Sequence, residues 1–336
     1  MHHNQKQLIR IGLLFESQVD IMSLPNATEA THYHWRELEE VEAVTKSLTA
    51  LGYQVDKIGI LDALLQLNSN SRQLPDFVWN LSVGVTSRNR TALAPAILEQ
   101  LGIPYTGGDA TVKSLTLNKD FLKPLLQWSG ILTPDWYCYD SAEDVKSLPP
   151  WSSAILKPSC EGYSLGLQRF DIQEGLTKLQ QTVAKMRKLF AAPIICEEFI
   201  VGREITVGVV GNSFPLLLGG VETVNAQGES LQTEILDLPA KRQGKYQKVG
   251  VDLFSPDLER LKQIVWQLMQ LLKPLDYATF DFRISTDGQP YLLDINADAT
   301  LHPQRSLAQI AYAAGLSYQQ LIEMILNVSW ERWQKK

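Results

Sequence analysis

The sequence predicts a mixed fold that begins as α/β, with a parallel sheet, and continues as α+β, with antiparallel strands. Three observations support this prediction. Apolar strands alternate with helices over the first third of the chain, short Gly-containing links then join consecutive strands, and an Asp-Gly pair interrupts an apolar stretch near the C-terminus. We therefore expect three lobes, formed by residues 1–110, 111–200 and 201–336.

The first lobe is predicted from two strands and two helices. Residues 8–15 (LIRIGLLF) and 76–81 (DFVWNL) are apolar runs typical of buried strands. Apolar residues recur at helical spacing over residues 35–52, where Gly52 marks the end, and residues 91–102 (TALAPAILEQLG) indicate a second helix. Strands alternating with helices favour a parallel sheet that helices cover on both faces.

The later lobes are predicted to be richer in antiparallel strands. One helix is expected from residue 112 to residue 130, and a long helix at 255–273 precedes a hairpin at 280–296. Two helices separated by Gly315 close the chain. Between these helices, four apolar stretches indicate strands: SAILK (153–157), PIICEEFI (193–200), REITVGVV (203–210) and SFPLLLGG (213–220).

Composition excludes several classes of function. The chain has 336 residues, of which 45% are hydrophobic, and no apolar run approaches the roughly 20 residues of a membrane span. The N-terminus lacks the apolar segment of a signal peptide, so we expect a cytoplasmic protein without a membrane partner. A net charge of -6 without a basic stripe argues against nucleic acid as a partner. Three widely spaced cysteines suggest neither a disulfide framework nor a zinc site.

The stretch FDFRISTDGQPYLLDIN, residues 280–296, places two acids on either side of an Asp-Gly turn. A two-residue loop at Asp287-Gly288 would set Asp281 directly opposite Asp294. Because side chains alternate between the faces of a strand, one face of this hairpin is apolar and the other almost wholly polar. The apolar face is expected to carry Phe280, Phe282, Ile284, Tyr291, Leu293 and Ile295, and the other face Thr279, Asp281, Arg283, Leu292, Asp294 and Asn296.

Two opposed carboxylates are destabilising unless a cation lies between them. A hard divalent ion suits this place, because magnesium beside a nucleotide is usually held by one or two carboxylates, with waters and phosphate oxygens as the remaining ligands. Asp281, Asp294 and Asn296 would supply two carboxylates and an amide oxygen. A solvated outer face on an ordinary antiparallel pair explains the same residues equally well, so other parts of the sequence must decide.

A lysine followed by a loop of small residues is a second candidate feature. In AILKPSCEGYSLGL, residues 154–167, Lys157 ends a predicted strand, and Gly162, Ser164 and Gly166 follow in the loop. Small residues let backbone N–H groups approach phosphate oxygens, and the lysine adds a compact positive charge. The stretch is not a P-loop, and by itself such a loop is also typical of an ordinary turn.

Acidic residues in ICEEFIVGREITV form a third candidate feature. The strand edge after Glu197 could pair with an adenine, and an acid further along could accept hydrogen bonds from a ribose. The same acids are also compatible with solvated strand ends. This motif alone therefore leaves both interpretations open.

Taken together, these motifs resemble the ATP-grasp enzymes of the D-alanine–D-alanine ligase family. The resemblance covers about residues 75 to 325 and rests on five stretches in the family order: LGIPYTGG with LNKD, ILKPSCEGYSLG, CEEFIVGREITV, LPAKRQ and the hairpin. Several weak motifs in the right order make a specific one. The resemblance implies the ATP-grasp fold behind an N-terminal α/β domain, an ATP-dependent ligase, ATP and magnesium as cofactors with manganese able to replace magnesium, and a homodimer.

The resemblance also assigns roles to matching positions. Lys119 and Lys157 would contact ATP phosphates beneath the loop with Gly162 and Ser164, and Lys241 would reach the terminal phosphate. Without the resemblance, Lys119 would pass for a solvated helix lysine. The remaining roles are adenine binding by Glu197 and the backbone around Glu198 and Ile200, ribose binding by Glu204, and magnesium binding by Asp281, Asp294 and Asn296.

The chain departs from the family where the substrates would bind. Thr279 stands where family ligases carry an arginine that stabilises the developing oxyanion. The segment ADATLHPQRSL, residues 297–307, replaces the usual Ser-Pro-Gly-Met type of segment, and the N-terminal Gly-rich loop with its substrate-binding glutamate is absent. We expect Arg283, Arg242 or Arg305 to supply the missing charge, unless the reaction has no intermediate of the usual kind.

Two kinds of enzyme and one binding protein fit these observations. The first is a ligase of the mycosporine-like amino acid branch, which joins mycosporine-glycine to the amine of an amino acid and releases ADP and phosphate. The second is an ordinary dipeptide ligase, a true D-alanine one included, and the third is a regulatory module that binds ATP without turnover. In either ligase, His302, Arg305 and Ser306 are candidates to bind the carboxylate of the amino acid.

Overall fold

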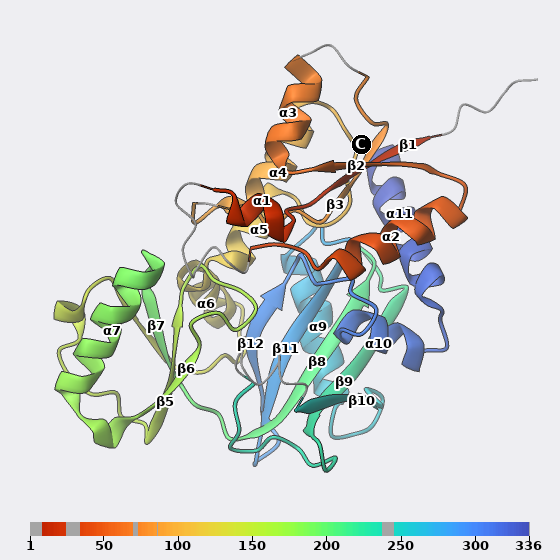
Figure 1. The fold of residues 1–336 in the computed structure, drawn as a ribbon. Coiled ribbons are helices and arrows are strands. Elements are labelled where there is room, and N and C mark those ends of the chain that lie inside the picture. Colours follow the sequence, from red (N-terminus) through yellow and green to blue (C-terminus); the bar gives the residue numbers. More distant parts are fainter. Residues whose placement is uncertain (1–8, 25–33, 70–72, 86, 237–244, 336) are drawn as a thin grey trace, which may run out of the picture.

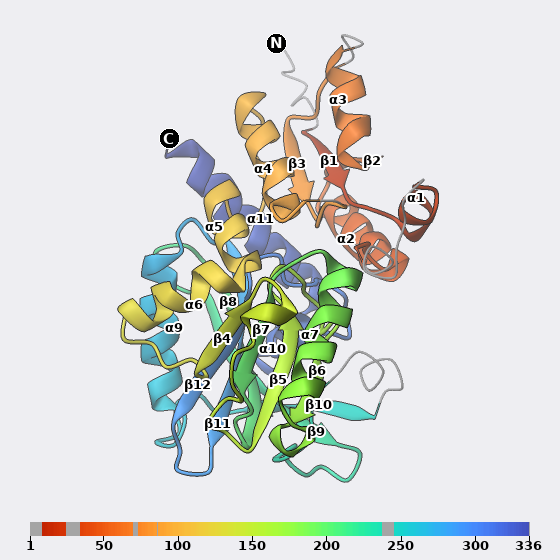
Figure 2. The same ribbon diagram turned by 90° about the vertical axis from the view of Figure 1, so that its left-hand side faces the viewer.

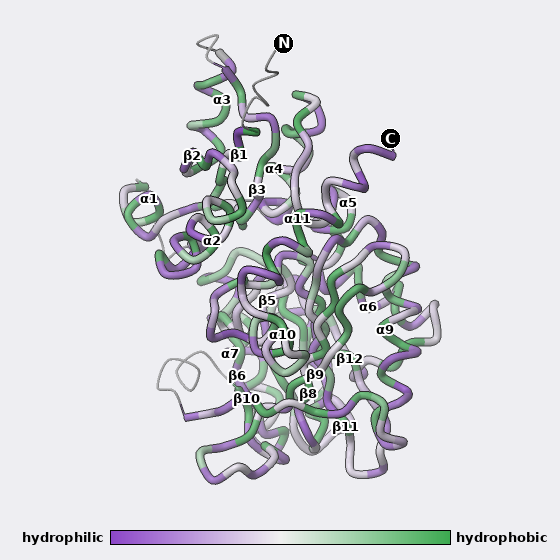
Figure 3. The backbone as a smooth tube through the Cα atoms, turned by 90° about the vertical axis from the view of Figure 1, so that its right-hand side faces the viewer, coloured by the Kyte–Doolittle hydropathy of each residue, from purple (hydrophilic) through white to green (hydrophobic). Residues whose placement is uncertain are grey.

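A computed structural model describes residues 9–24, 34–69, 73–85, 87–236 and 245–335. The elements form three lobes, each built on its own sheet, as Figures 1 and 2 show in two perpendicular views. Figure 3 shows hydrophobic segments along the strands and hydrophilic ones on many outer loops. Among the described residues, no helix has the length and apolar character that crossing a membrane requires.

The N-terminal lobe is the parallel α/β unit that the sequence predicts. Its three strands lie in the order β2-β1-β3, and both pairings are parallel. The sheet is small, and β2 and α3 were not predicted. The elements are β1 (Arg10–Leu14), α1 (Gln18–Met22), α2 (Leu38–Ala50), β2 (Gln54–Gly59), α3 (Leu61–Ser69), β3 (Phe77–Asn80) and α4 (Arg90–Gln100).

The helix expected at residues 112–130 is in fact two helices, α5 (Ala110–Leu117) and α6 (Lys119–Trp128). Asn118 breaks the helix with ψ of 89°, far from helical values. Its side-chain amide donates hydrogen bonds to the carbonyls of Ser114 at 2.6 Å and Arg88 at 3.1 Å, which stabilises the break. Lys119 is therefore the first residue of a new helix.

The central lobe is a four-stranded antiparallel sheet in the order β4-β7-β5-β6. The helix α7, which was not predicted, covers one face of this sheet (Figure 2). Leu179, Val183 and Met186 point from α7 into a core with Leu156 and Cys196 of the strands. The elements are β4 (Trp136–Tyr139), β5 (Ser153–Pro158), β6 (Gln168–Asp171), α7 (Leu176–Phe190) and β7 (Ile194–Glu198).

The C-terminal lobe is a five-stranded antiparallel sheet in the order β10-β9-β8-β11-β12. One face packs on α9, and α10 crosses part of the other face. Gly208 and Gly219, which pair across β8 and β9, allow this approach, since an added Cβ would come within 2.8 and 2.7 Å of Ile310. The elements are β8 (Gly202–Val210), β9 (Leu217–Asn225), β10 (Tyr246–Val251), α9 (Glu259–Leu271), β11 (Tyr277–Ser285), β12 (Pro290–Asn296), α10 (Ser306–Ala313) and α11 (Tyr318–Gln334).

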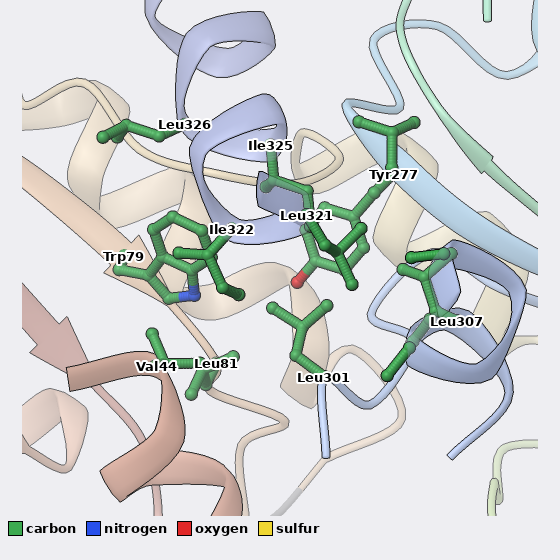
Figure 4. Close-up of a cluster of buried hydrophobic side chains, with 14 of the residues drawn as sticks. Val44, Trp79, Leu81, Tyr277, Leu301, Leu307, Leu321, Ile322, Ile325 and Leu326 are labelled. Carbon is green, nitrogen blue, oxygen red and sulfur yellow. The ribbon is translucent and has the colours of Figure 1, made fainter. Parts of the chain in front are cut away.

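The hydrophobic cores do not follow contiguous segments of chain. Trp79 and Leu81 of the N-terminal lobe pack against Leu321, Ile322 and neighbouring residues of α11 (Figure 4). The helices α5 and α6 pack on the core of the five-stranded sheet through residues such as Val112, Leu122 and Leu126. The expected division at residues 111–200 groups α5 and α6 with the central lobe, whereas these helices pack on the core of the five-stranded sheet. The helix α11 contributes to the core of the first lobe.

Candidate active site

A cavity of about 690 Å³ lies where the three lobes meet. Strands β5 and β7 of the central lobe, β8 and β11–β12 of the C-terminal lobe, and the segment before α2 all contribute to its wall. The close packing of α10 on Gly208 and Gly219 brings the start of that helix to the same wall. Among the residues predicted from the sequence, those that line it are Lys119, Lys157, Gly162, Ser164, Glu197, Glu198, Ile200, Glu204, Asp281, Arg283, Asp294, Asn296, Arg305 and Ser306.

The hairpin of β11 and β12 places Asp281 directly opposite Asp294, as the sequence predicts. The turn is not the predicted two-residue loop, however, because the backbone of Ser285 pairs with that of Gln289 across three residues. Leu293 is an extra residue in β12 that shifts the register between Phe282 and Asp281. This bulge cancels the longer turn and restores the predicted partnership of the two acids.

Because of the bulge, the predicted faces of β12 were wrong at Tyr291, Leu292 and Leu293. Leu292 pairs with Phe282 and is buried in the core, whereas Leu293 lines the cavity. Tyr291 pairs with Arg283 and so lies on the cavity side of the hairpin, not on the apolar face. Directly paired residues share a face of the sheet. One extra residue therefore moves the side chains between it and the turn to the opposite face.

The oxygen atoms on the cavity face of the hairpin are suited to a hard divalent cation. Asp281 accepts hydrogen bonds from Thr206 at 2.7 Å and from the Asn296 amide at 3.0 Å. The Lys119 ammonium lies 3.4 Å from the Asp294 carboxylate. The described residues contain no cluster of three or more His, Cys, Asp or Glu side chains that could hold a metal, so a cation here would need the Asn296 oxygen, water or a ligand.

Lys119 reaches the cavity because of the break before α6. Its side chain is 6% exposed, and its ammonium donates to the carbonyl of Glu161 at 2.8 Å. The backbone N–H of Lys119 donates to the carbonyl of Ser159 at 3.2 Å. Both acceptors belong to the loop that follows β5, so the loop and the lysine fix each other in place.

Lys157 and Lys123 share the carboxylate of Glu197. The ammonium groups lie 2.6 and 3.0 Å from its two oxygens, and all three side chains are buried. Burial alone would raise the pKa of Glu197, but the two lysines together lower it below its usual value. The carboxylate therefore orients the two lysines. Glu197 also lines the cavity, and the adenine contact that the resemblance assigned to it stays a prediction.

The loop after β5 has an unusual backbone. Tyr163 and Ser164 adopt positive φ angles of 54° and 60°, a conformation that non-glycine residues rarely take. The Ser164 hydroxyl donates to the carbonyl of Leu236 at 3.0 Å. Gly162 has no positive φ, and a Cβ there would meet no atom within 4 Å, so this glycine borders open space.

The residues predicted to bind the adenine and the ribose line the same cavity as an apolar surface formed by Ile155, Phe199 and Ile200. Glu198 is half-buried. Its pKa is raised mainly by this burial and secondly by the negative charge of Asp135. Glu204 lies 3.4 Å from Arg283.

Arg283 is occupied by other contacts. Its guanidinium donates to the carbonyls of Ile200 at 2.9 Å, Gln232 at 3.0 Å and Glu234. The side chain is 4% exposed and packs over the Phe199 ring. Arg283 therefore cross-links the wall of the cavity, and this reduces its capacity to supply the charge missing at Thr279.

The three predicted substrate residues divide into two groups. Arg305 and Ser306 line the cavity at the start of α10. His302 does not line it, because its Nε2 lies 3.1 and 3.3 Å from the carboxylates of Glu37 and Glu39 at the start of α2. Arg305 also pairs with Glu37 at 3.1 Å. Lys241 and Arg242 lie outside the described residues.

Several polar residues of the site were not found from the sequence. Lys123 had a signal, because it lies four residues after Lys119 on one helix face, where two lysines would repel each other without a nearby acid. His34, Arg36 and Arg90 of the N-terminal lobe also line the cavity. These three approach it through tertiary packing, which no local pattern reveals.

Comparisons with known proteins agree with this architecture. A family model described as "D-ala D-ala ligase C-terminus" matches residues 124–327. A D-alanine–D-alanine ligase of Aquifex aeolicus is 29% identical over 86% of this chain and 94% of the ligase. One of Maridesulfovibrio salexigens is 30% identical over 72% of this chain and 77% of the ligase.

The fold has the same relatives. The crystal structure of a Bacillus anthracis D-alanine–D-alanine ligase complexed with ATP aligns with a TM-score of 0.69, at 19% identity, over 97% of this chain and 99% of the ligase. The fold expected from the sequence is thereby confirmed. The chain therefore belongs to the D-alanine–D-alanine ligase family of ATP-grasp enzymes, ligases that use ATP and magnesium to form carbon–nitrogen bonds.

Proposed function

We propose that this ligase uses ATP to phosphorylate an oxygen of its first substrate, and that the amine of an amino acid then displaces the phosphate. The observation that carries this proposal is the meeting of Asp281, Asp294 and Asn296 with Lys119 and Lys157 in one cavity. Phosphoryl transfer depends mainly on positioning and on neutralising negative charge. These five residues supply both requirements.

Each group in the phosphate region has a proposed task. Asp281, Asp294 and Asn296 hold magnesium, which neutralises phosphate charge when it is bound. Lys119 and Lys157 supply fixed positive charge, and Glu197 orients Lys157 through their 2.6 Å contact. Lys241, which the family resemblance assigns to the terminal phosphate, belongs to the same group.

The nucleoside end of ATP would occupy the apolar part of the cavity. Ile155, Phe199 and Ile200 provide a surface for the adenine, and the strand edge at Glu198 provides backbone partners. Glu204 accepts hydrogen bonds from the ribose, and its contact with Arg283 sets the position of its carboxylate. The loop with Gly162 and Ser164 covers the phosphates and excludes water from the reactive intermediate.

The acceptor chemistry is proposed from the residue at position 279. Thr279 lines the cavity, and the guanidinium of Arg283, its neighbour on the same face, is occupied by carbonyls. Arg305 is half-exposed and paired with Glu37. Of the three candidate arginines, the two that the structure describes are thus already paired, which favours a first substrate whose activation needs no arginine-stabilised oxyanion.

A vinylogous acid meets that requirement. We infer mycosporine-glycine as the first substrate. The ketone oxygen on its ring takes the terminal phosphoryl group of ATP, which releases ADP. The amine then attacks the carbon that bears this oxygen, and phosphate leaves as the nitrogen loses its protons and the imine forms. Arg305 and Ser306 at the start of α10 bind the carboxylate of the amino acid. A dipeptide ligase, including a D-alanine one, uses the same phosphate site and is the alternative.

ADP release by the purified protein with magnesium and ATP tests these alternatives. Turnover with mycosporine-glycine and an L-amino acid, together with an imine product by mass spectrometry, supports the proposal. Turnover with D-alanine alone identifies a dipeptide ligase, and ATP binding without turnover on any acceptor identifies a regulatory module. Light scattering on the same sample tests the homodimer that the family resemblance implies.

A further inference from the structure

Glu161 belongs to the central lobe, yet its carboxylate is bound by two side chains of the N-terminal lobe. It lies in the loop between β5 and β6. Its Oε2 is 2.8 Å from Nε2 of His34 and 3.1 Å from a guanidinium nitrogen of Arg90. The three side chains are between 6% and 8% exposed, so this contact is made within the protein interior.

The backbone of the same loop joins this cluster to the phosphate region. Arg90 donates a second hydrogen bond to the carbonyl of Cys160 at 2.7 Å. The carbonyl of Glu161 accepts from the Lys119 ammonium at 2.8 Å, and this ammonium lies 3.4 Å from Asp294. Two residues of the N-terminal lobe are thus connected, through Glu161, to a lysine and an acid of the candidate phosphate and metal site.

The geometry of His34 makes the contact specific. Its Nδ1 lies 3.0 Å from the carbonyl of Val85, which can only accept a hydrogen bond. Its Nε2 faces the Glu161 carboxylate, which also accepts when ionised. Both ring nitrogens therefore face acceptor oxygens, which fixes the ring between Val85 of its own lobe and Glu161 of the central lobe.

A third contact between the same lobes lies two residues further along. Arg36, which is 1% exposed, donates to the Tyr163 hydroxyl at 2.7 Å. Tyr163 and Ser164 have positive φ angles. A strained segment of this kind persists only where its surroundings over-determine it. Here Arg36 of the N-terminal lobe holds Tyr163, and Leu236 of the C-terminal lobe holds Ser164.

We propose that Glu161, Arg90 and His34 form a cross-lobe latch that positions Lys119 and the loop between β5 and β6, residues 159–167. The affinity for ATP is then set partly by the N-terminal lobe. This inference rests on the proposed ATP site. The three are positioning residues, because they act through the loop and Lys119. Without the latch, the loop occupies its binding-competent arrangement for a smaller fraction of the time, and the apparent dissociation constant rises by the inverse of that fraction.

The first test compares wild type with Glu161→Gln by calorimetric titration of a non-hydrolysable ATP analogue in the presence of magnesium, and by steady-state kinetics. We expect the dissociation constant and the KM for ATP to rise about 10-fold while kcat stays within about 2-fold, because saturating ATP restores the competent arrangement. The matched control is Glu143→Gln, the same change at an exposed residue of the central lobe, which should leave all three values unchanged.

A double-variant cycle tests the connection between lobes. Arg90→Met and Glu161→Gln both break the Arg90–Glu161 contact, so the free-energy losses of the two single variants should sum to more than the loss in the double variant. Only Arg90→Met also removes the hydrogen bond to Cys160, which adds its own share. The double variant also removes one positive and one negative charge together. It is the variant to measure if the single Glu161→Gln protein does not fold.

Several outcomes would overturn the latch. Unchanged nucleotide affinity in both the single and the double variant would do so. A large fall in kcat with an unchanged dissociation constant would do so as well, because Glu161 would then act in the chemical step. A wild-type protein that does not bind the analogue would refute the proposed ATP site itself, which separates the two failures.

Discussion

Asp281 and Asp294 face each other directly across the β11–β12 hairpin, although the residues nearer the turn are paired one position out of step with them. The bulge at Leu293 accounts for the difference. Two carboxylates at this spacing repel each other in the absence of a cation, and the Lys119 ammonium, 3.4 Å from Asp294, offsets only part of that charge. The pair therefore stores a like-charge repulsion that a divalent ion would relieve.

A first prediction follows from this repulsion. Asp294→Asn should raise the melting temperature of the protein without magnesium, and it should abolish the further rise that magnesium gives the wild type. ADP formation should fall by at least about 100-fold, because even outer-shell changes at metal sites cost about 10- to 100-fold. Thermal melts with and without magnesium and an ADP assay measure the two effects. Asp287→Asn, an exposed acid in the turn of the same hairpin, should behave as wild type.

The buried triad of Lys123, Glu197 and Lys157 leads to a second prediction. Lys123→Met leaves Glu197 with one lysine and should lower the free energy of unfolding by about 3 kcal/mol, the lower end for a broken buried pair. Urea denaturation at neutral pH measures this loss. Lys188→Met, on the exposed side of α7, is the matched control and should change the free energy of unfolding by less than about 0.5 kcal/mol.

The same triad has a pH dependence with a defined sign. The lysines lower the pKa of Glu197 in the folded protein below its ordinary value of 4.5. Its contribution to stability is therefore fully present above that value, and it is lost as the pH falls through the lower folded-state pKa. In Glu197→Gln, this part of the acid-dependent loss should be absent, and an unchanged pH profile of unfolding would argue against the assignment.

Arg283 provides a third prediction, which separates two roles. If Arg283 cross-links the carbonyls of Ile200, Gln232 and Glu234, its replacement by methionine should lower the free energy of unfolding by at least about 3 kcal/mol, since each hydrogen bond from a charged donor contributes about 1.5 to 3 kcal/mol. As a catalytic charge, its loss would instead lower kcat by about 100- to 1,000-fold with little effect on stability. Urea denaturation and single-turnover kinetics on folded protein distinguish these results, and we expect the first.

A fourth prediction concerns Arg332 of α11. It donates to both oxygens of the fully buried Asp276 at 2.9 Å, and to the carbonyls of Tyr105 at 2.8 Å and Gly107 at 3.1 Å. Arg332→Met would leave the carboxylate with only neutral partners and should cost about 3 to 5 kcal/mol. A melting-temperature drop of several degrees is the expected readout. The exposed Lys335→Met serves as the control, and an equal effect in both variants would show that the buried pair is not the cause.

The hairpin shows which structural features a local sequence pattern can predict and which it cannot. Alternation predicts a polar face with Asp281, Asp294 and Asn296, and these residues line the cavity as expected. It cannot locate the bulge, because Leu292 and Leu293 are both leucine, and either one satisfies the apolar face. Only packing against Phe282 in the core decides which is buried.

Contacts between lobes were beyond the reach of the sequence. The pairing of His34 and Arg90 with Glu161 joins residues 127 and 71 positions apart, and no periodicity connects them. The pairing of Glu197 with Lys123 was missed for the same reason, since Lys123 lies on a helix of a different segment. The helices, the strands and the motifs on them could be predicted because they depend on local pattern. Ion-pair partners depend instead on where distant segments meet.

The contribution of α11 to the first core bears on how the protein is made. Residues Leu321, Ile322 and Ile325 fill the interior beside Trp79 and Leu81, yet they are synthesised long after the strands of the first lobe. At synthesis rates of about 5 to 20 residues per second, the nascent N-terminal sheet waits at least about ten seconds for its covering helix. During that interval its apolar surface is available to chaperones, so the core of the first lobe should be completed only after α11 has been synthesised.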